Sequence, residues 1–261
     1  ANWLAAESMD VRLTGQVVAA PRWQNPSIEL VTVRALYNLE EIAFLIEWDD
    51  PFKDELHQSG IEFDPQEISR MGAFNSYVAA NDVVPRQLET FRDAIALQFP
   101  VKLPEGTKKP HFFRGDSSNP VHLWQWRSDG VENSAQAVQE SNARGWKQPA
   151  KVQPGENQQV DAVASWNQGR WSVIMRRPLL TDDRNDIQFV KGRFIPLALN
   201  AWDGSNGEHG LIMSLSTWHS VILEAPVPIK IYLYTLLAVV ASGALGLWLV
   251  RKERRRVAAV G

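Results

Sequence analysis

The sequence predicts a mainly β protein, an antiparallel β-sandwich with short helices in its loops, followed by one C-terminal transmembrane helix. Three observations support this fold class. Polarity alternates with a period of two along much of the chain, and the apolar runs are short and separated by Pro, Gly, Asn and Asp. One long run without charged residues stands near the C-terminus. Many short strands with few long helical patterns are typical of a sandwich.

Short segments rich in β-branched and aromatic residues are the candidate strands. They are Val11–Val18, Ile28–Tyr37, Glu41–Trp48, Ala94–Pro100, Val121–Arg127, Ala162–Asn167, Arg170–Arg176, Asp186–Lys191, Phe194–Trp202 and Leu215–Leu223. The steps Asn167–Gly169 and Lys191–Gly192 predict tight hairpin turns.

Two polar stretches do not fit strands, namely Pro51–Arg92 and Arg127–Asp161. We expect loops with short helices there. Loops of this length in a compact domain more often have a function or contact a partner than have no role.

The stretch Ile231–Val250 contains twenty residues and no charge. At about 1.5 Å per residue it covers the roughly 30 Å hydrocarbon core of a bilayer. Tyr232, Tyr234 and Trp248 can lie at the two headgroup layers. The alternative is a buried helix of a soluble core, but such helices rarely run this long without a charge.

Five basic residues lie within the segment Arg251–Arg256, directly after this run. Because basic flanks stay in the cytoplasm, we expect residues 1–228 on the extracytoplasmic, periplasmic side of the cell membrane. Residues 229–250 then form a single-pass helix and residues 251–261 a cytoplasmic tail. The chain begins at Ala1 rather than Met, which fits removal of a signal peptide and equally fits a trimmed chain.

Composition excludes several function classes. The sequence contains no cysteine, which excludes disulfides, thiolate metal sites and covalent c-type haem. The net charge is −3, and because residues 229–261 carry +5, residues 1–228 carry −8. An acidic domain argues against nucleic acid and is compatible with a basic protein partner. We find no catalytic constellation and no phosphate-binding loop, so any substrate chemistry belongs to a partner.

Several strings occur in a characteristic order. They are Ala35–Asn38, Ala43–Pro51, Asp93–Pro100, Gly115–Trp126, Arg177–Leu179 and Ala201–Glu208 leading into Ser214–Trp218. Together they resemble the haem b-binding γ subunit of ethylbenzene dehydrogenase and related molybdenum enzymes of the dimethyl sulfoxide reductase family. The resemblance runs from about Asp10 to Leu223. The C-terminal anchor is more similar to tethered members, such as γ-like subunits of nitrite oxidoreductases and archaeal b-type cytochromes.

The resemblance implies a β-sandwich that holds one non-covalent haem b and transfers electrons. The expected partners are an iron–sulfur β subunit and a molybdenum catalytic subunit, together with a cytochrome or membrane electron carrier and the lipid bilayer. The chain itself would be a non-catalytic subunit of an oxidoreductase complex. The alternative is a haem-less structural or anchoring subunit with the same sandwich.

The family's two haem ligands, a Met and a Lys, are replaced in this sequence. Arg114 stands where the family places its Met, and arginine offers iron no lone pair. Met213 stands where the family places its Lys, and its thioether is a competent ligand. We therefore predict Met213 and His111 as the axial ligands of the haem iron, with His122 as the second choice to His111.

Each of these residues has a structural alternative. Met213 could fill the core, and His111 could be a surface histidine. Arg114 could pair with a haem propionate or be an exposed loop charge. Trp124 and Trp126 alternate on one strand and so share a face, where they could wall a flat cofactor or fill the sandwich core.

Overall fold

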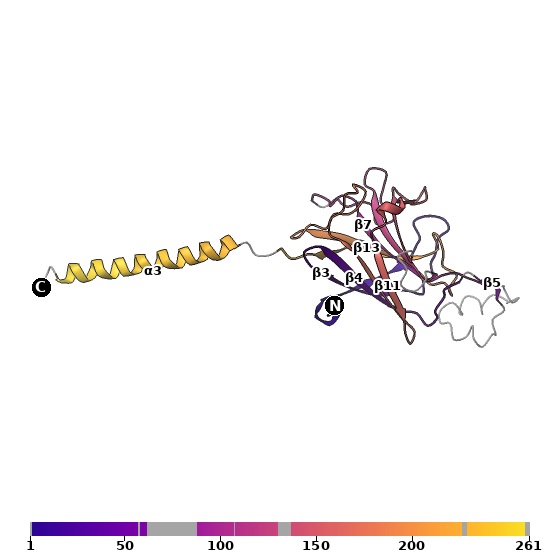
Figure 1. Ribbon diagram of the computed structural model, residues 1–261, viewed down its shortest axis with the longest axis horizontal. Coiled ribbons are helices and arrows are strands. Elements are labelled where there is room, and N and C mark those ends of the chain that lie inside the picture. The colour runs from indigo at the N-terminus through magenta and orange to yellow at the C-terminus, as the bar shows by residue number, and fades with distance from the viewer. Residues whose placement is uncertain are drawn as a thin grey trace. The chain divides into compact units, whose positions relative to one another are not determined.

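The computed structural model describes residues 2–56, 58–61, 88–106, 108–129, 137–225 and 229–258. The chain divides into two units, Ala1–Leu223 and Glu224–Gly261. The first unit, called the β-domain below, contains the strands, and the second contains one long helix (Figure 1). Most of the predicted polar stretch Pro51–Arg92 lies outside the described residues.

The β-domain is built from two antiparallel sheets. The five-stranded sheet has the order β1 (Ser8–Arg12), β3 (Leu30–Tyr37), β4 (Glu41–Asp49), β12 (Arg170–Pro178) and β11 (Asp161–Trp166). The eight-stranded sheet runs β10 (Lys151–Val152), β9 (Val138–Ala143), β8 (Val121–Arg127), β7 (Ala94–Pro100), β13 (Phe194–Trp202), β14 (Ser214–Leu215) and β2 (Thr14–Gly15), and β15 (His219–Ile222) also pairs with β13.

Smaller elements complete the described part of the β-domain. Strands β5 (Gln58–Ile61) and β6 (Leu88–Thr90) pair with each other, and η1 (Trp3–Ala5) and η3 (Gly155–Asn157) are single turns of 3₁₀ helix. Side chains from both large sheets meet in one buried cluster, which includes Phe44 and Trp48 from β4 and Phe99 and Trp124 from β7 and β8. This shared core confirms the predicted sandwich.

The predicted hairpin at Asn167–Gly169 is confirmed. Asn167 and Arg170 exchange both backbone hydrogen bonds, at 2.9 and 3.1 Å. Gln168 and Gly169 both have positive φ, 50° and 79°, as a type I′ turn requires. The turn therefore joins β11 to β12 in the register Trp166↔Trp171.

The strand prediction for Asp186–Lys191 is wrong, because this segment is an irregular loop. Some of its backbone groups bond to side chains, and the Phe189 N–H donates to the Leu179 carbonyl oxygen at 2.9 Å. The Ile187 N–H donates to His122 Nδ1 at 3.3 Å, and Arg177 donates to the Ile187 carbonyl oxygen. Gly192 does adopt the positive φ of a turn, 78°, but this turn does not join two strands.

The prediction of loops for Arg127–Asp161 is also incomplete. Strand β9 lies inside this stretch and pairs with β8 along its whole length, from Val121↔Ala143 to Trp126↔Val138. Its sequence is polar, so its periodicity gave no strand signal. The short strand β10 also lies there, whereas residues 144–150 form a loop and η3 is a short helix, as predicted. Residues 130–136 lie outside the described residues.

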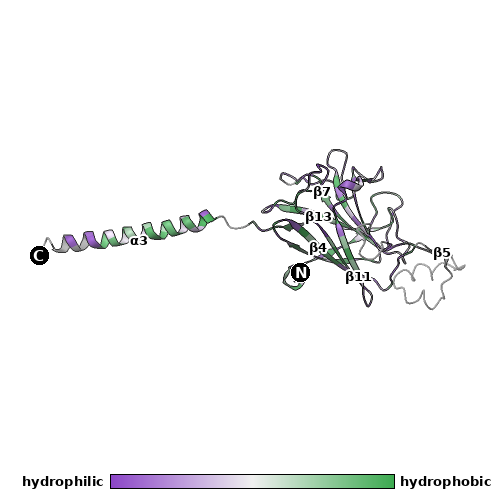
Figure 2. Ribbon diagram, in the orientation of Figure 1, coloured by the Kyte–Doolittle hydropathy of each residue, from purple (hydrophilic) through white to green (hydrophobic). Residues whose placement is uncertain are grey.

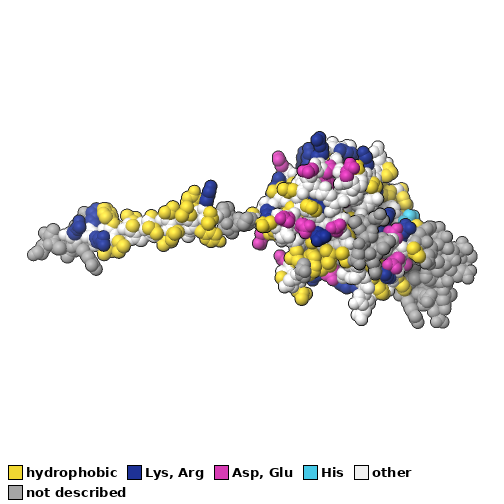
Figure 3. All heavy atoms as spheres, in the orientation of Figure 1, with side chains coloured by type: hydrophobic (Ala, Val, Ile, Leu, Met, Phe, Trp, Pro, Cys, Tyr) yellow, Lys and Arg dark blue, Asp and Glu magenta, His cyan; other side chains and the backbone are white. Residues whose placement is uncertain are grey.

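The second unit contains helix α3 (Ile229–Ala258). Its segment Ile229–Lys252 is long and apolar enough to cross a membrane. Figure 2 shows the helix hydrophobic over most of its length and hydrophilic toward its C-terminal end. In Figure 3 basic side chains gather near that end. The predicted C-terminal helix is thus confirmed, and the sidedness of the membrane stays a prediction.

Candidate functional site

The eight-stranded sheet has two different faces, which strand β7 shows most clearly. Ile95, Leu97 and Phe99 point into the sandwich core. Ala94 and Ala96 belong to a second buried cluster, which lies on the opposite, outer face. We call this second group the outer cluster.

Met213 lies within the outer cluster and is fully buried. It packs with Phe113, Trp202 and Leu215, and Phe112, Val18, Ala19, Leu211 and Trp146 surround this group. The backbone at Met213 is fixed by Gln16, which is itself fully buried: the Gln16 N–H donates to the Met213 carbonyl oxygen at 3.0 Å. Gln16 Nε2 also donates to Leu211 O at 3.0 Å. The backbone that carries the thioether is therefore held by hydrogen bonds.

His111 lies at the edge of the outer cluster. Its ring stacks on Phe112 with 4.7 Å between centroids and lies 5.2 Å from Trp146. His111 Nδ1 accepts the Phe113 N–H at 3.1 Å, which leaves Nε2 as the ring nitrogen free to bind a ligand. The structure thus brings His111 and Met213, two predicted site residues, to the same face of the sheet.

The loop that carries His111 is fastened to the sheet by Gln98, a fully buried residue on the outer side of β7. Gln98 Nε2 donates to Phe112 O at 2.6 Å, and the Arg114 N–H donates to Gln98 Oε1 at 3.1 Å. Gly115 follows with φ 69°, and a Cβ there would lie 2.6 Å from Asn119 O. Only glycine fits this position.

Arg114 is half-buried in this loop with φ 58°. Burial lowers the pKa of its guanidinium. Among the residues that the structure describes, no carboxylate forms an ion pair with it. A partly buried cation without an acid partner suits an anionic group of a ligand.

Trp124 and Trp126 lie on the inner face of the same sheet. Trp124 packs against Phe99, with 5.0 Å between ring centroids, and Trp126 packs against Trp171 at 4.9 Å. These indoles could wall a flat cofactor or fill the sandwich core, and the structure shows that they fill the core. The sheet separates them from Met213.

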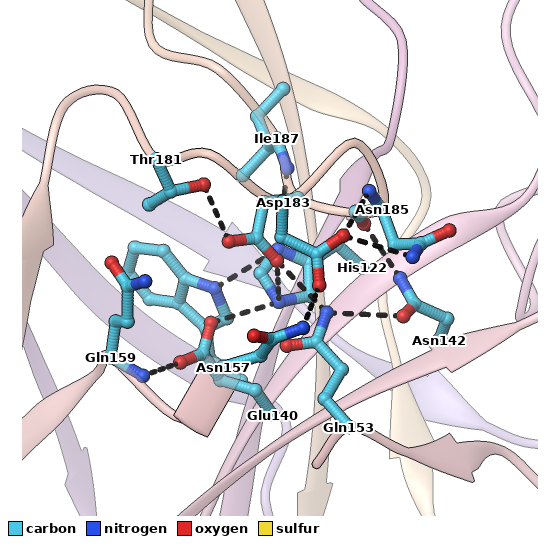
Figure 4. Close-up of polar contacts among 12 residues, drawn as sticks. His122, Glu140, Asn142, Gln153, Asn157, Gln159, Thr181, Asp183, Asn185 and Ile187 are labelled. Carbon is cyan, nitrogen blue, oxygen red and sulfur yellow. Dashed lines mark hydrogen bonds and ion pairs between the residues drawn. The ribbon is translucent and has the colours of Figure 1, made fainter. Parts of the chain in front are cut away.

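His122 also points inward, into a buried group of polar side chains (Figure 4). Its Nδ1 accepts N–H groups from Trp124 and Ile187, at 3.4 and 3.3 Å. Its Nε2 lies 3.0 Å from Glu140 Oε2 and 3.4 Å from Asp186 Oδ1. The structure therefore does not bring the second-choice ligand to Met213.

Arg177 completes this inner polar group, and its role was not apparent in the sequence. The side chain is fully buried, and Nη1 lies 3.2 Å from Asp186 Oδ2 and 3.7 Å from Glu140 Oε2. Burial raises the pKa of Glu140, but the contacts with His122, the Gln159 N–H and Arg177 outweigh it, so the pKa is lowered. The inner group holds its acids beside the Arg177 guanidinium. In the sequence, the only feature that drew attention to Arg177 was the string Arg177–Leu179, which contributed to the family resemblance.

A hollow of about 900 Å³ lies beside the loop that carries His111. Its charged lining residues are Lys102, Lys108, Arg144, Arg184 and Glu105. The hollow is therefore cationic, although residues 1–228 as a whole are acidic.

Comparison with known proteins adds to this geometry. The ethylbenzene dehydrogenase family model matches residues 1–151 and 142–214. The chain belongs to the ethylbenzene dehydrogenase family. The matched region includes the loop of His111 and ends just after Met213, so the outer cluster apart from Leu215 lies within the part that matches this family.

Two relatives carry names that refer to reductases. A candidate respiratory nitrate reductase heme subunit of Haloferax mediterranei is 25% identical over 83% of this chain and 64% of its own length. The chlorate reductase subunit gamma of Ideonella dechloratans is 29% identical over 49% of this chain and 48% of its own length. The chain thus spans less than two thirds of each of these relatives.

The solved structures that match this chain are more distant. A candidate carbohydrate-binding protein from Bacteroides uniformis superposes with a TM-score of 0.42 and 11% identity over 86% of this chain and 82% of its own. A family 9 carbohydrate-binding module from Caldicellulosiruptor kristjanssonii gives 0.38 and 7% over 87% and 88%.

Proposed function

We propose that this chain is a haem-binding electron-transfer subunit of a membrane-associated oxidoreductase complex, with the haem on the outer face of the eight-stranded sheet. The observation that carries the proposal is the buried thioether of Met213 in one cluster with the loop of His111. Family membership and the heme subunit named among the relatives support it.

The residues of the outer cluster fit such a group. Ala94 and Ala96 make the sheet surface flat at this point, and Phe113, Trp146 and Trp202 supply an apolar surround. Haem supplies reversible one-electron transfer when bound. The protein needs only to ligate the iron and keep water away from it.

We propose Met213 and His111 as the axial ligands. Methionine sulfur and a free histidine nitrogen are both competent donors to haem iron, and a Met/His pair raises its reduction potential. Attachment would be non-covalent, as in haem b, because the sequence has no cysteine to form thioether bonds. Arg114, which lacks an acid partner among the described residues, would pair with a propionate.

We further propose a place for the chain in a complex. It would relay electrons between an iron–sulfur β subunit, which serves a molybdenum catalytic subunit, and a cytochrome or membrane carrier. Helix α3 would lie in the bilayer with the β-domain on the periplasmic side and the basic tail in the cytoplasm. The names of the nitrate and chlorate reductase relatives motivate this arrangement.

A visible spectrum of the full chain tests the proposal. The protein is purified in detergent from haem-replete cells, reduced with dithionite and converted to its pyridine haemochrome. We expect the sharp α band of a b-type haem. A folded protein without this absorption would contradict the proposal and favour a haem-less anchoring subunit.

The assignment of His111 has its own test. Replacing the ligand by glycine opens a site that free imidazole can enter, so His111→Gly should lose the low-spin spectrum and regain it on addition of imidazole. A variant that keeps the wild-type spectrum without imidazole would show that another side chain binds the iron.

A further inference from the structure

Three buried aspartates meet at one end of the sandwich, and none of them is among the residues proposed to hold the haem. Asp50 directly follows β4 of the five-stranded sheet, Asp93 directly precedes β7, and Asp203 directly follows β13. Strands β7 and β13 pair through Ala94↔Trp202, so Asp93 and Asp203 emerge side by side. One carboxylate oxygen from each aspartate lies within 4.8 Å of those of the other two.

These acids are enclosed by protein. Asp50 is 1% exposed, Asp93 is fully buried and Asp203 is 5% exposed. Within the described ranges, no Lys, Arg or His side chain forms an ion pair with any of them. A buried carboxylate without a counter-charge is costly and requires a proton or a cation.

Asp50 also has a buried carboxylate oxygen without a hydrogen-bond partner in the part of the chain that the structure describes. Its Oδ1 accepts the Phe52 N–H at 3.1 Å, but its Oδ2 is buried and has no hydrogen-bond partner among the described residues. Asp54, the next acid along the loop, likewise has a buried Oδ2 without a partner. Two carboxylate oxygens, one of them from the cluster itself, are thus buried without a hydrogen-bond donor among the described residues.

Neutral hydrogen-bond donors hold the carboxylates in position and bring no positive charge. Asp93 accepts the backbone N–H groups of Gly204 and Asp54, at 2.9 and 2.8 Å, and the indole N–H of Trp171 at 3.0 Å. The Ser205 N–H, the Ser205 hydroxyl and the Asn206 N–H donate to Asp203 Oδ1. A Cβ on Gly204 would lie 2.2 Å from Phe91 O, so the loop is packed too closely for any other residue.

The raised pKa values of Asp50 and Asp93 agree with the lack of a counter-charge in this cluster. Burial, then repulsion by Asp203 and Asp93, raises the pKa of Asp50 to about 10. Burial also raises the pKa of Asp93 to about 8, with Asp54 and Asp203 adding to the effect. Each acid destabilises the charge of its neighbours.

We propose that Asp50, Asp93 and Asp203, with Asp54 beside them, form a calcium site that joins the two sheets. All donors are oxygens, which calcium prefers, whereas zinc favours nitrogen and sulfur. A cation at about 2.4 Å from each ligand spans oxygens up to about 4.8 Å apart. The ion would connect the end of β4 to the ends of β7 and β13, and this role goes beyond electron transfer.

Calcium content and thermal stability of the full chain in detergent test the proposal. The protein is treated with a chelator and then titrated with calcium alone. We expect about one calcium per chain and a rise in melting temperature of about 5–10 °C when calcium is about 100-fold above its Kd. No bound calcium and identical melting temperatures with chelator and with about 1 mM calcium would overturn the proposal, since protons would then neutralise the cluster.

Substitutions locate the ion. Asp50→Asn and Asp203→Asn should each weaken calcium binding more than tenfold, because each removes a charged ligand. In chelator, Asp50→Asn should melt no lower than the wild type, since it removes a repulsion, so loss of binding is distinguishable from misfolding. Asp49→Asn changes an exposed neighbour that pairs with Arg170 and should bind calcium normally. Normal binding by Asp50→Asn would contradict the site, whatever the haem spectrum of the same sample shows.

Discussion

The two faces of the eight-stranded sheet are built from the same strands and differ in what they bury. On the inner face, large aromatic side chains such as Phe99 and Trp124 interlock with the opposite sheet. On the outer face, β7 presents Ala94 and Ala96, and a loop and Met213 lie over them. The inner face is a packed core, whereas the outer face combines small residues with side chains that can bind metal or anions.

The polar groups on the two faces differ in the same way. Inside, Glu140 and Asp186 lie beside the Arg177 guanidinium, so these acids already have a cation. Outside, Arg114 has no acid partner among the described residues. The acids of the inner face therefore lie beside a cation of the same chain, whereas the outer face offers a cation and a ring nitrogen that a ligand can use.

The largest effect on stability should come from the inner face. Trp124→Ala removes a fully buried indole and should lower the free energy of unfolding by about 3–5 kcal/mol. Denaturant titration measures this loss. If the two faces of the sheet have separate roles, the haem content per folded molecule of this variant should stay at the wild-type level. Loss of haem without loss of stability would show that the two faces do not have separate roles.

The inner polar group should give an intermediate effect with a defined pH dependence. The pKa of Glu140 is lowered in the folded protein, so its stabilising contribution is present above the usual Glu pKa of about 4.3 and is lost as the pH falls through the folded value. Glu140→Gln should cost about 1.5–3 kcal/mol near neutral pH and should show a weaker loss of stability in acid. The free energy of unfolding of the wild type and of Glu140→Gln, measured from pH 7 to pH 3, checks both expectations. An equal loss of stability in acid for the two proteins would contradict this account.

The smallest effect on stability should come from Gln98, which lies on β7 but faces outward. Gln98→Ala leaves Phe112 O and the Arg114 N–H without their partner and should cost about 1–2 kcal/mol. Because the loop of His111 loses its fastening, haem should dissociate faster despite this modest cost. Transfer of haem to apomyoglobin measures the rate, and an unchanged rate would show that the loop is held by other contacts.

The sequence predicted the central strands of the eight-stranded sheet well. Strands β7, β8 and β13 have the predicted bounds, because their runs of β-branched and aromatic residues are buried on both faces or nearly so. Strand β9 was missed because Glu140 and Ser141 are polar yet buried. Burial of Glu140 depends on His122 and Arg177, which are distant in sequence and which no local pattern reveals.

The candidate site was predicted in part. The family positions of Arg114 and Met213, with the nearby His111, pointed to residues that the structure places on one face. Alternation showed that Trp124 and Trp126 share a face, but not which face looks inward, because a strand buried on both sides gives no such signal. The contribution of Gln98 could not be predicted either, since its partners are backbone groups of a loop fourteen and sixteen residues away.

The most direct test of the central claim compares two buried methionines, one on each side of the eight-stranded sheet. Met213 lies in the outer cluster and Met175 in the sandwich core, and both are fully buried. The reduced and oxidised visible spectra of Met213→Ala and Met175→Ala are recorded alongside the wild type. Our account predicts that Met213→Ala loses the low-spin spectrum or the haem itself, whereas Met175→Ala is less stable but keeps the wild-type spectrum. A wild-type low-spin spectrum in folded Met213→Ala would contradict it.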